Sequence, residues 1–303
     1  MIKSNIGLKA QYQLRILNAD RSLKWESGWI PNLITDLGMD RIGNNGGAQF
    51  APFCRIGTGT TTPAFTDTEL VSQSASTATV ITSSLVNAGA PNYETTASST
   101  YEFALGAVVG NMAELGMGWT ASTANTLATR SRILDGGGSP TTITVLSSEI
   151  LQVTYQMRTF PQITDSTGNV TISGVVYGYT ARLLSAASAA GFRFESSPLN
   201  TVSTASAYTG SLGAITASAP SGTSTVLTSG VLQPYTNGTY FRDYTITAAI
   251  AVGNLAGGIK SIRTTLAGSA GTWSNSQIEF TPAIPKDNTK SFSLTLRTSW
   301  ARH

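Results

Sequence analysis

The chain has 303 residues and a formal net charge of +3, a length that allows two domains with real hydrophobic cores. Charged residues make up only 12% of it, and 35 serines and 44 threonines predict a neutral, hydroxyl-rich surface. The hydrophobic share of 41% excludes a polyelectrolyte disordered chain, and the scattered basic residues exclude a nucleic-acid-binding tail.

Reactive side chains are scarce. The only histidine is His303 and the only cysteine is Cys54, which excludes a zinc site built from Cys and His. One cysteine cannot form an internal disulfide, which fits folding in a reducing cytoplasm, and we expect Cys54 to be a small buried hydrophobe. The sequence shows neither a signal-peptide pattern nor a stretch apolar enough to span a bilayer, so we expect no membrane insertion.

In chain order, the patterns predict an all-β protein with one helix. Leu8–Ile16 alternates apolar and polar residues, as a half-buried strand does. A second strand around Leu23–Trp29 would complete a hairpin, and Asn32–Ile42 is the one convincing helix. Short β-like runs separated by turn residues follow, a spacing typical of a β-sandwich or a jelly roll.

Short sequences recur in the same order in the two halves of the chain. Thr79–Ser83 matches Thr225–Ser229, and Arg158–Thr159 matches Arg297–Thr298. This order favours a degenerate tandem duplication over chance recurrence in a biased composition. The expected units are a β domain of residues 1–160, with the helix and a Gly-Thr-rich loop, and a related, shorter β domain of residues 161–303.

The segment Ser196–Phe241 contains no Asp, Glu, Lys or Arg. Its turn formers and β-branched residues favour ordered β structure, and a disordered, prion-like segment is the alternative. A neighbour can cover these 46 residues without burying an unpaired charge. We therefore expect this segment to form the largest protein contact, and we expect that contact to survive high salt.

The motifs for common enzyme sites are incomplete. The glycine-rich run Gly253–Ser261 fails the phosphate-loop spacing, because Ile259 separates Lys260 from the preceding glycine. A serine nucleophile lacks a base, since the one imidazole is at the last residue. We predict no catalytic residue, no cofactor and no bound metal.

Two pairs of acids are close enough in sequence to suggest a glycosidase. They are Asp67 with Glu69 and Glu94 with Glu102, and ordinary solvated positions explain them equally well.

The aromatic residues suggest possible contacts. All five tryptophans have apolar neighbours, so packing explains them without a ligand. Three tyrosines of the charge-free segment are the better candidates for an interface or a sugar contact. They are Tyr208, Tyr235 and Tyr240.

A family resemblance rests on three stretches. They are Tyr12–Asp20 with Trp29, Asn32–Thr35 and Gly38–Asp40; Arg55–Pro63 followed by Asp67–Leu70; and Ala113–Trp119 with Thr129–Ile133, Thr142–Val145 and Leu151–Arg158. Together they make residues 6–160 similar to virion structural proteins of tailed bacteriophages, the tail-fibre, collar and minor tail proteins. The resemblance implies a non-enzymatic β-rich subunit, made in the bacterial cytoplasm and assembled with copies of itself and other virion proteins.

The absence of a heptad stalk and of a Gly-X-Y repeat favours a compact adaptor, collar, tail or surface module over a slender fibre. Two other classes stay open. A virion protein that binds a host glycan would use exposed aromatic side chains, and a polysaccharide depolymerase would need two acids in one cleft.

Overall fold

The structure is a computed structural model that describes residues 1–44, 48–185, 193, 195–196, 201–268 and 271–303. Nearly all of its regular structure is β-strand, with one short helix, which confirms the all-β prediction. Among the described residues, no helix is long and apolar enough to cross a membrane.

Most strands belong to one large, curled sheet of thirteen. Its members are β1 (Ile2–Asn18), β2 (Leu23–Glu26), β3 (Ile30–Ile34), β4 (Phe53–Gly57), β5 (Gln73–Thr77), β6 (Val80–Asn87), β7 (Thr95–Phe103), β9 (Glu114–Gly118), β10 (Leu127–Arg132), β12 (Glu149–Pro161), β17 (Thr228–Leu232), β18 (Phe241–Ala248) and β21 (Phe292–Arg302).

A second sheet has six strands, and two further short strands pair with each other. The six are β13 (Ser166–Ile172), β14 (Val175–Leu183), β15 (Thr201–Tyr208), β16 (Ser224–Val226), β19 (Ile259–Gly268) and β20 (Gly271–Ile284); the short pair is β8 (Gly110–Met112) and β11 (Ile143–Val145).

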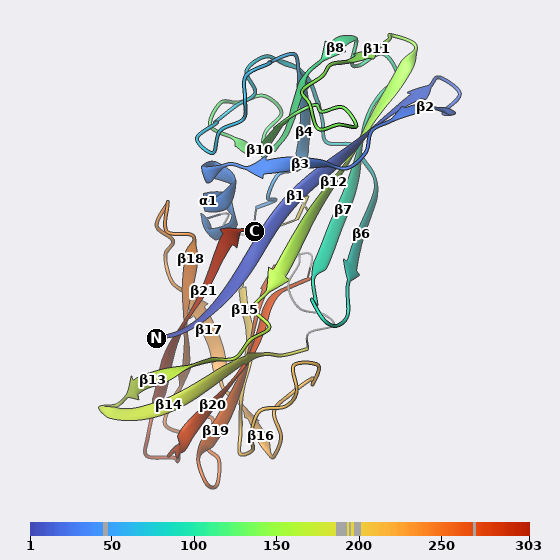
Figure 1. The fold of residues 1–303 in the computed structure, drawn as a ribbon. Helices are drawn as coiled ribbons and strands as arrows, with labels where there is room; N and C mark the ends of the chain where they lie inside the picture. The colour runs from blue at the N-terminus through green and yellow to red at the C-terminus, as the bar shows by residue number, and fades with distance from the viewer. Residues whose placement is uncertain (45–47, 186–192, 194, 197–200, 269–270) are drawn as a thin grey trace.

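The long strand β1 connects the parts of the molecule. Figure 1 shows it crossing most of the length of the molecule, between the six-stranded sheet and the end that carries β2, β8 and β11. Its apolar side chains point alternately into the core, as the sequence pattern predicts. The buried ones are Ile2, Ile6, Leu8, Ala10, Tyr12, Leu14, Ile16 and Leu17.

Both edges of β1 are paired. One edge pairs antiparallel with β12 from Ile6 to Asn18. The other edge pairs in turn with β21, β3 and β2, and its pairing with β21 from Ile2 to Leu8 is parallel. The first and last strands of the chain therefore lie side by side.

The short sequences that recur in the two halves lie on strands that are arranged similarly on the two sides of β1. On one side the order is β12, β7, β6, and on the other it is β21, β18, β17. Arg158–Thr159 lies on β12 and Arg297–Thr298 on β21, while Thr79–Ser83 enters β6 and Thr225–Ser229 runs from β16 into β17. The large sheet draws strands from both halves, and the division near residue 160 stays a prediction.

The predicted helix exists, but it begins later than the sequence indicated. The helix α1 covers Asp36–Asn44, whereas the segment predicted to open it forms β3, which pairs with β1 and β10. The Thr35 hydroxyl accepts a hydrogen bond from the Gly38 amide at 3.0 Å and so caps the helix. Strand pairing before this cap moves the helix start from Asn32 to Asp36.

One cluster of buried apolar side chains runs through both large sheets. Cys54 is fully buried in it, as expected, and burial raises the pKa of its thiol well above the usual value. Trp300 is buried, while Trp29 is 43% exposed, so not every tryptophan is a core residue.

Three tyrosine rings meet within this core, from three neighbouring strands. The Tyr155 ring centroid lies 5.9 Å from that of Tyr12 and 6.5 Å from that of Tyr101. The Tyr12 hydroxyl donates to the carbonyl oxygen of Arg132 at 2.7 Å, which ties β1 to the end of β10. Burial raises the pKa of all three phenols, and that of Tyr244, above the ordinary value near 10.

These tyrosines predict a limit on alkaline stability. In the unfolded chain they ionise near pH 10, and the folded state holds them neutral, so stability should be lost as pH rises above about 10. Ultraviolet absorbance should show them ionising only together with the loss of β circular dichroism. A single ionisation step of all ten tyrosines in a chain that stays folded would contradict this.

Candidate functional site

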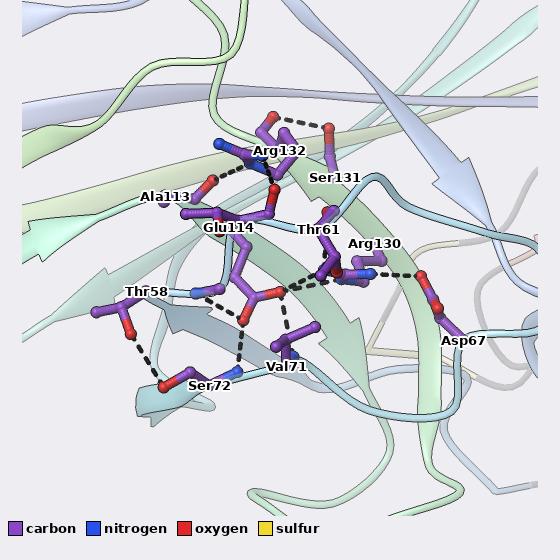
Figure 2. A network of polar contacts seen from close by, with 12 residues as sticks. Thr58, Thr61, Asp67, Val71, Ser72, Ala113, Glu114, Arg130, Ser131 and Arg132 are labelled. Atoms are coloured by element: carbon purple, nitrogen blue, oxygen red, sulfur yellow. Dashed lines mark hydrogen bonds and ion pairs between the residues drawn. The ribbon is translucent and has the colours of Figure 1, made fainter.

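A buried carboxylate organises the loop between β4 and β5. Glu114, on β9, is fully buried, and its oxygens accept hydrogen bonds from three backbone amides of that loop. The donors are Gly59 at 3.1 Å, Val71 at 3.2 Å and Ser72 at 2.8 Å. The two ends of the loop are thus held to one side chain (Figure 2).

Arg130, on the neighbouring strand β10, neutralises this carboxylate. Its Nε lies 3.0 Å from Glu114 Oε2, and its Nη1 lies 2.6 Å from Asp67 Oδ2. Its Nη2 donates to the carbonyl oxygen and the hydroxyl of Thr61 at 3.1 and 2.9 Å. Figure 2 shows the guanidinium between the two acids, so this buried cation holds the middle of the loop as well.

The glycines of the Gly-Thr loop make this approach possible. A Cβ on Gly59 would lie 2.3 Å from Glu114 Oε1, and a Cβ on Gly57 would lie 2.2 Å from the carbonyl oxygen of Ser72. Neither position has room for a side chain. The sequence therefore needs glycine where the loop folds over the carboxylate.

An open cleft of about 530 Å³ lies beside this network, a volume typical of small-molecule sites. It is bounded by β1, β3, β10, the loop and the end of the chain. Its apolar walls include Leu8, Leu33, Pro63, Phe65, Leu134 and Pro140. Its basic groups are Lys9, Arg130, Arg132, Arg302 and His303.

Two of these basic groups, Arg302 and His303, are held in place by contacts within the chain. Arg302 Nε donates to the carbonyl oxygen of Ile34 at 2.7 Å, its Nη2 lies 2.6 Å from Asp36, and its guanidinium lies 4.1 Å from the Phe65 ring centroid. The His303 ring stacks on Phe160 with centroids 4.1 Å apart. Among the described residues lining the cleft, no Asp or Glu is present, and its Arg130 and Arg302 are already paired with Asp67 and Asp36.

Two of the three candidate tyrosines lie together against α1. The Tyr235 hydroxyl donates to Asp40 at 2.7 Å and the Tyr240 hydroxyl to Asp36 at 3.0 Å. Burial, and then the hydrogen bond to the acid, raises the pKa of both phenols. Tyr208 is buried on β15 of the other sheet, so the three do not form one aromatic surface.

Three of the four acids in the suggested pairs bind different basic partners, and the fourth, Glu69, is exposed. Asp67 belongs to the Arg130 network. Glu94 bonds Arg158 at 2.6 Å, and Glu102 bonds Arg21 at 2.5 Å, at opposite ends of β7. Among the described residues, no group of three or more His, Cys, Asp or Glu side chains could hold a metal ion.

Comparisons with protein-family models, with curated proteins and with solved structures found no match.

The Glu114 network predicts a large cost for a single substitution. Glu114→Ala leaves Arg130 with Asp67 as its only acidic partner and three loop amides without their acceptor. We expect the free energy of unfolding, measured in denaturant, to fall by about 3–5 kcal/mol.

The matched control is Arg15→Ala. Its pair with Glu26 is solvent-exposed, so its removal should cost less than about 1 kcal/mol. Equal losses for the two variants would contradict the structural role assigned to Glu114.

Proposed function

We propose that this chain is a non-enzymatic structural subunit of a tailed-phage virion, acting through protein–protein interfaces. The resemblance of residues 6–160 to tail, collar and fibre-associated proteins supports the virion assignment. The partners would be copies of itself and other virion proteins, and the site of synthesis the host bacterial cytoplasm.

The uncharged sheet edges are the observation that carries the proposal. Among the described strands, six are terminal in the two large sheets, and they are β2, β5, β6, β13, β16 and β17. Only β2 carries charge, on Lys24 and Glu26, and none of the other five contains an Asp, Glu, Lys, Arg or Pro.

Edge strands present unpaired backbone N–H and C=O groups, which can template pairing with another chain. Proteins that stay monomeric commonly block such edges with charges, especially lysine, or with proline. Five edge strands that carry neither a charge nor a proline favour a chain that pairs with strands of neighbouring molecules.

Most acidic side chains pair with basic side chains of the same chain. Eleven of the sixteen acidic side chains form ion pairs within the chain. Several of these pairs hold loops to strands, as Arg130 does. Charge therefore supports the fold, while neutral strands are left for contacts.

The segment Ser196–Phe241 contributes two of the neutral terminal strands, β16 and β17, of which β17 also contacts β15. Val226 and Val231, one on each, are 57% and 63% exposed. These strands support the segment as a protein contact; its residues 197–200 lie outside the described part of the chain.

The alternative is a virion protein that binds a host glycan. The cleft supports it, because Phe65 is 50% exposed at a rim that also carries basic groups. Binding of host polysaccharide by the isolated chain would favour this alternative.

The proposal predicts that the chain is a multi-copy component of purified particles from a phage that encodes it. Quantitative mass spectrometry should find it in several copies per particle. It should stay bound after a wash at about 1 M salt, because screening weakens ionic contacts and leaves apolar burial intact. Absence from particles, or release by moderate salt, would contradict the assignment.

A further inference from the structure

The strand β6 is the most open of the neutral edges. Figure 1 shows it as the outermost strand on its side of the molecule, and among the described strands it pairs only with β7. Most of its residues are exposed, including Ile81 at 44% and Val86 at 59%.

The backbone of β6 has groups that face away from β7. The Ala88 amide donates to the Glu94 carbonyl oxygen at 2.8 Å, in the same register as the pairing of Asn87 with Thr95. Hydrogen-bonded pairs alternate along an antiparallel ladder, so the even-numbered residues from 82 to 86 bond β7. Ser83 and Leu85 therefore direct their N–H and C=O groups outward.

The sequence of β6 is symmetric in residue type about Ser83. Thr82 and Ser84 flank it with hydroxyls, Ile81 and Leu85 follow with branched aliphatic chains, and Val80 and Val86 are identical. The strand thus shows the same chemistry when read from either end.

We propose that two copies of this chain pair antiparallel along β6, about a twofold axis through Ser83. This inference rests on the proposed function, for which it names one contact. A twofold axis perpendicular to a sheet keeps each side chain on its own face of the sheet. An even-numbered residue can therefore pair only with an even-numbered residue of the second copy, and an odd-numbered residue only with an odd-numbered one. Pairing about Ser83 meets this condition.

The resulting pairs are chemically matched on both faces. Ser83 meets Ser83 of the second copy, and Ile81, at the register shift, lies opposite Leu85. Thr82 meets Ser84 on the other face. Cross-strand pairs of this kind stabilise a sheet, and the outward groups of Ser83 would form two hydrogen bonds across the axis.

The surroundings set the extent of the contact. A register shift between Val80 and Thr82 leaves Ile81 without a partner on β7, which ends the regular ladder there. Glu94, beyond the other end of β6, is neutralised by Arg158. The shared ladder therefore covers Ile81–Leu85, and no unpaired charge of β6 opposes it.

A cysteine at the axis tests the geometry. In the full chain, Ser83→Cys should form a covalent dimer under oxidised glutathione, because directly paired residues have Cα atoms about 5.5 Å apart. Asn87→Cys is the matched control on the same strand. Its two copies would lie about 27 Å apart at ~3.4 Å per residue and should stay monomeric. Cys54 is buried and should not compete.

A charge at the axis tests the association. The wild-type chain should sediment towards twice its mass of 31.6 kDa as its concentration rises. Ser83→Lys places two ammonium groups face to face and should raise the dissociation constant about 100-fold. Thr247→Lys adds the same charge on an exposed position of β18, which is paired on both sides, and should leave association unchanged.

The outcomes separate this contact from the proposed function. A folded Ser83→Cys variant that crosslinks no better than Asn87→Cys overturns the pairing, even if the chain is a multi-copy component of particles. Unchanged association of a folded Ser83→Lys variant overturns it as well. Crosslinking at Ser83 by a chain absent from particles supports the pairing and contradicts the virion assignment. Circular dichroism of each variant shows that the fold is kept.

Discussion

Hydrogen bonding along both edges of β1 is the interaction on which the rest of the fold depends. One edge carries β12 through thirteen residue pairs, and the other carries β21, β3 and β2. Because β1 and β21 are the first and last strands of the chain, the large sheet is complete only when the whole chain has folded. Residues 1–160 alone would leave the edge of Ile2–Leu8 uncovered. This non-local pairing joins the two halves into one sheet, whatever their origin.

The same architecture explains where the charges lie. A loop that crosses a sheet must satisfy its backbone groups, and Glu114 and Arg130 do this for the loop between β4 and β5 from within the sheet. Such a pair is costly to desolvate and is tolerated because every oxygen and most donors have partners. A chain with 12% charged residues that uses them in this way has few left for its edges. The few charged residues pair with each other inside the fold, and this leaves most edge strands neutral.

Local sequence patterns predicted strands such as β1. Contacts between residues far apart in the sequence determine the start of the helix and the Glu114 network. Alternation is strong enough in β1 to show its buried face, whereas Asn32 and Leu33 were predicted to open the helix and instead pair with β1 and β10 as part of β3. The Glu114–Arg130 pair was missed because the register sets Glu114 opposite Arg132, and its other partners come from a loop more than forty residues away. The available signal was one acid at the start of the apolar run Glu114–Gly118 and two arginines in Leu127–Arg132. Tyr235 and Tyr240 were recognised as candidates, but their partners on α1 are about two hundred residues distant.

Neutral edges must also be kept from pairing at random. Five residues of ladder along β6 give only a few hydrogen bonds and small side-chain contacts, so one such contact is weak between free chains. In an assembly such as the proposed virion, other interfaces would hold neighbouring subunits together, and the effective concentration at each edge would rise steeply. The same edge would then be occupied without further contacts. A symmetric sequence and a register shift at Ile81 would restrict which strand fits, so in the proposed assembly the order would come from the sequence pattern instead of charge.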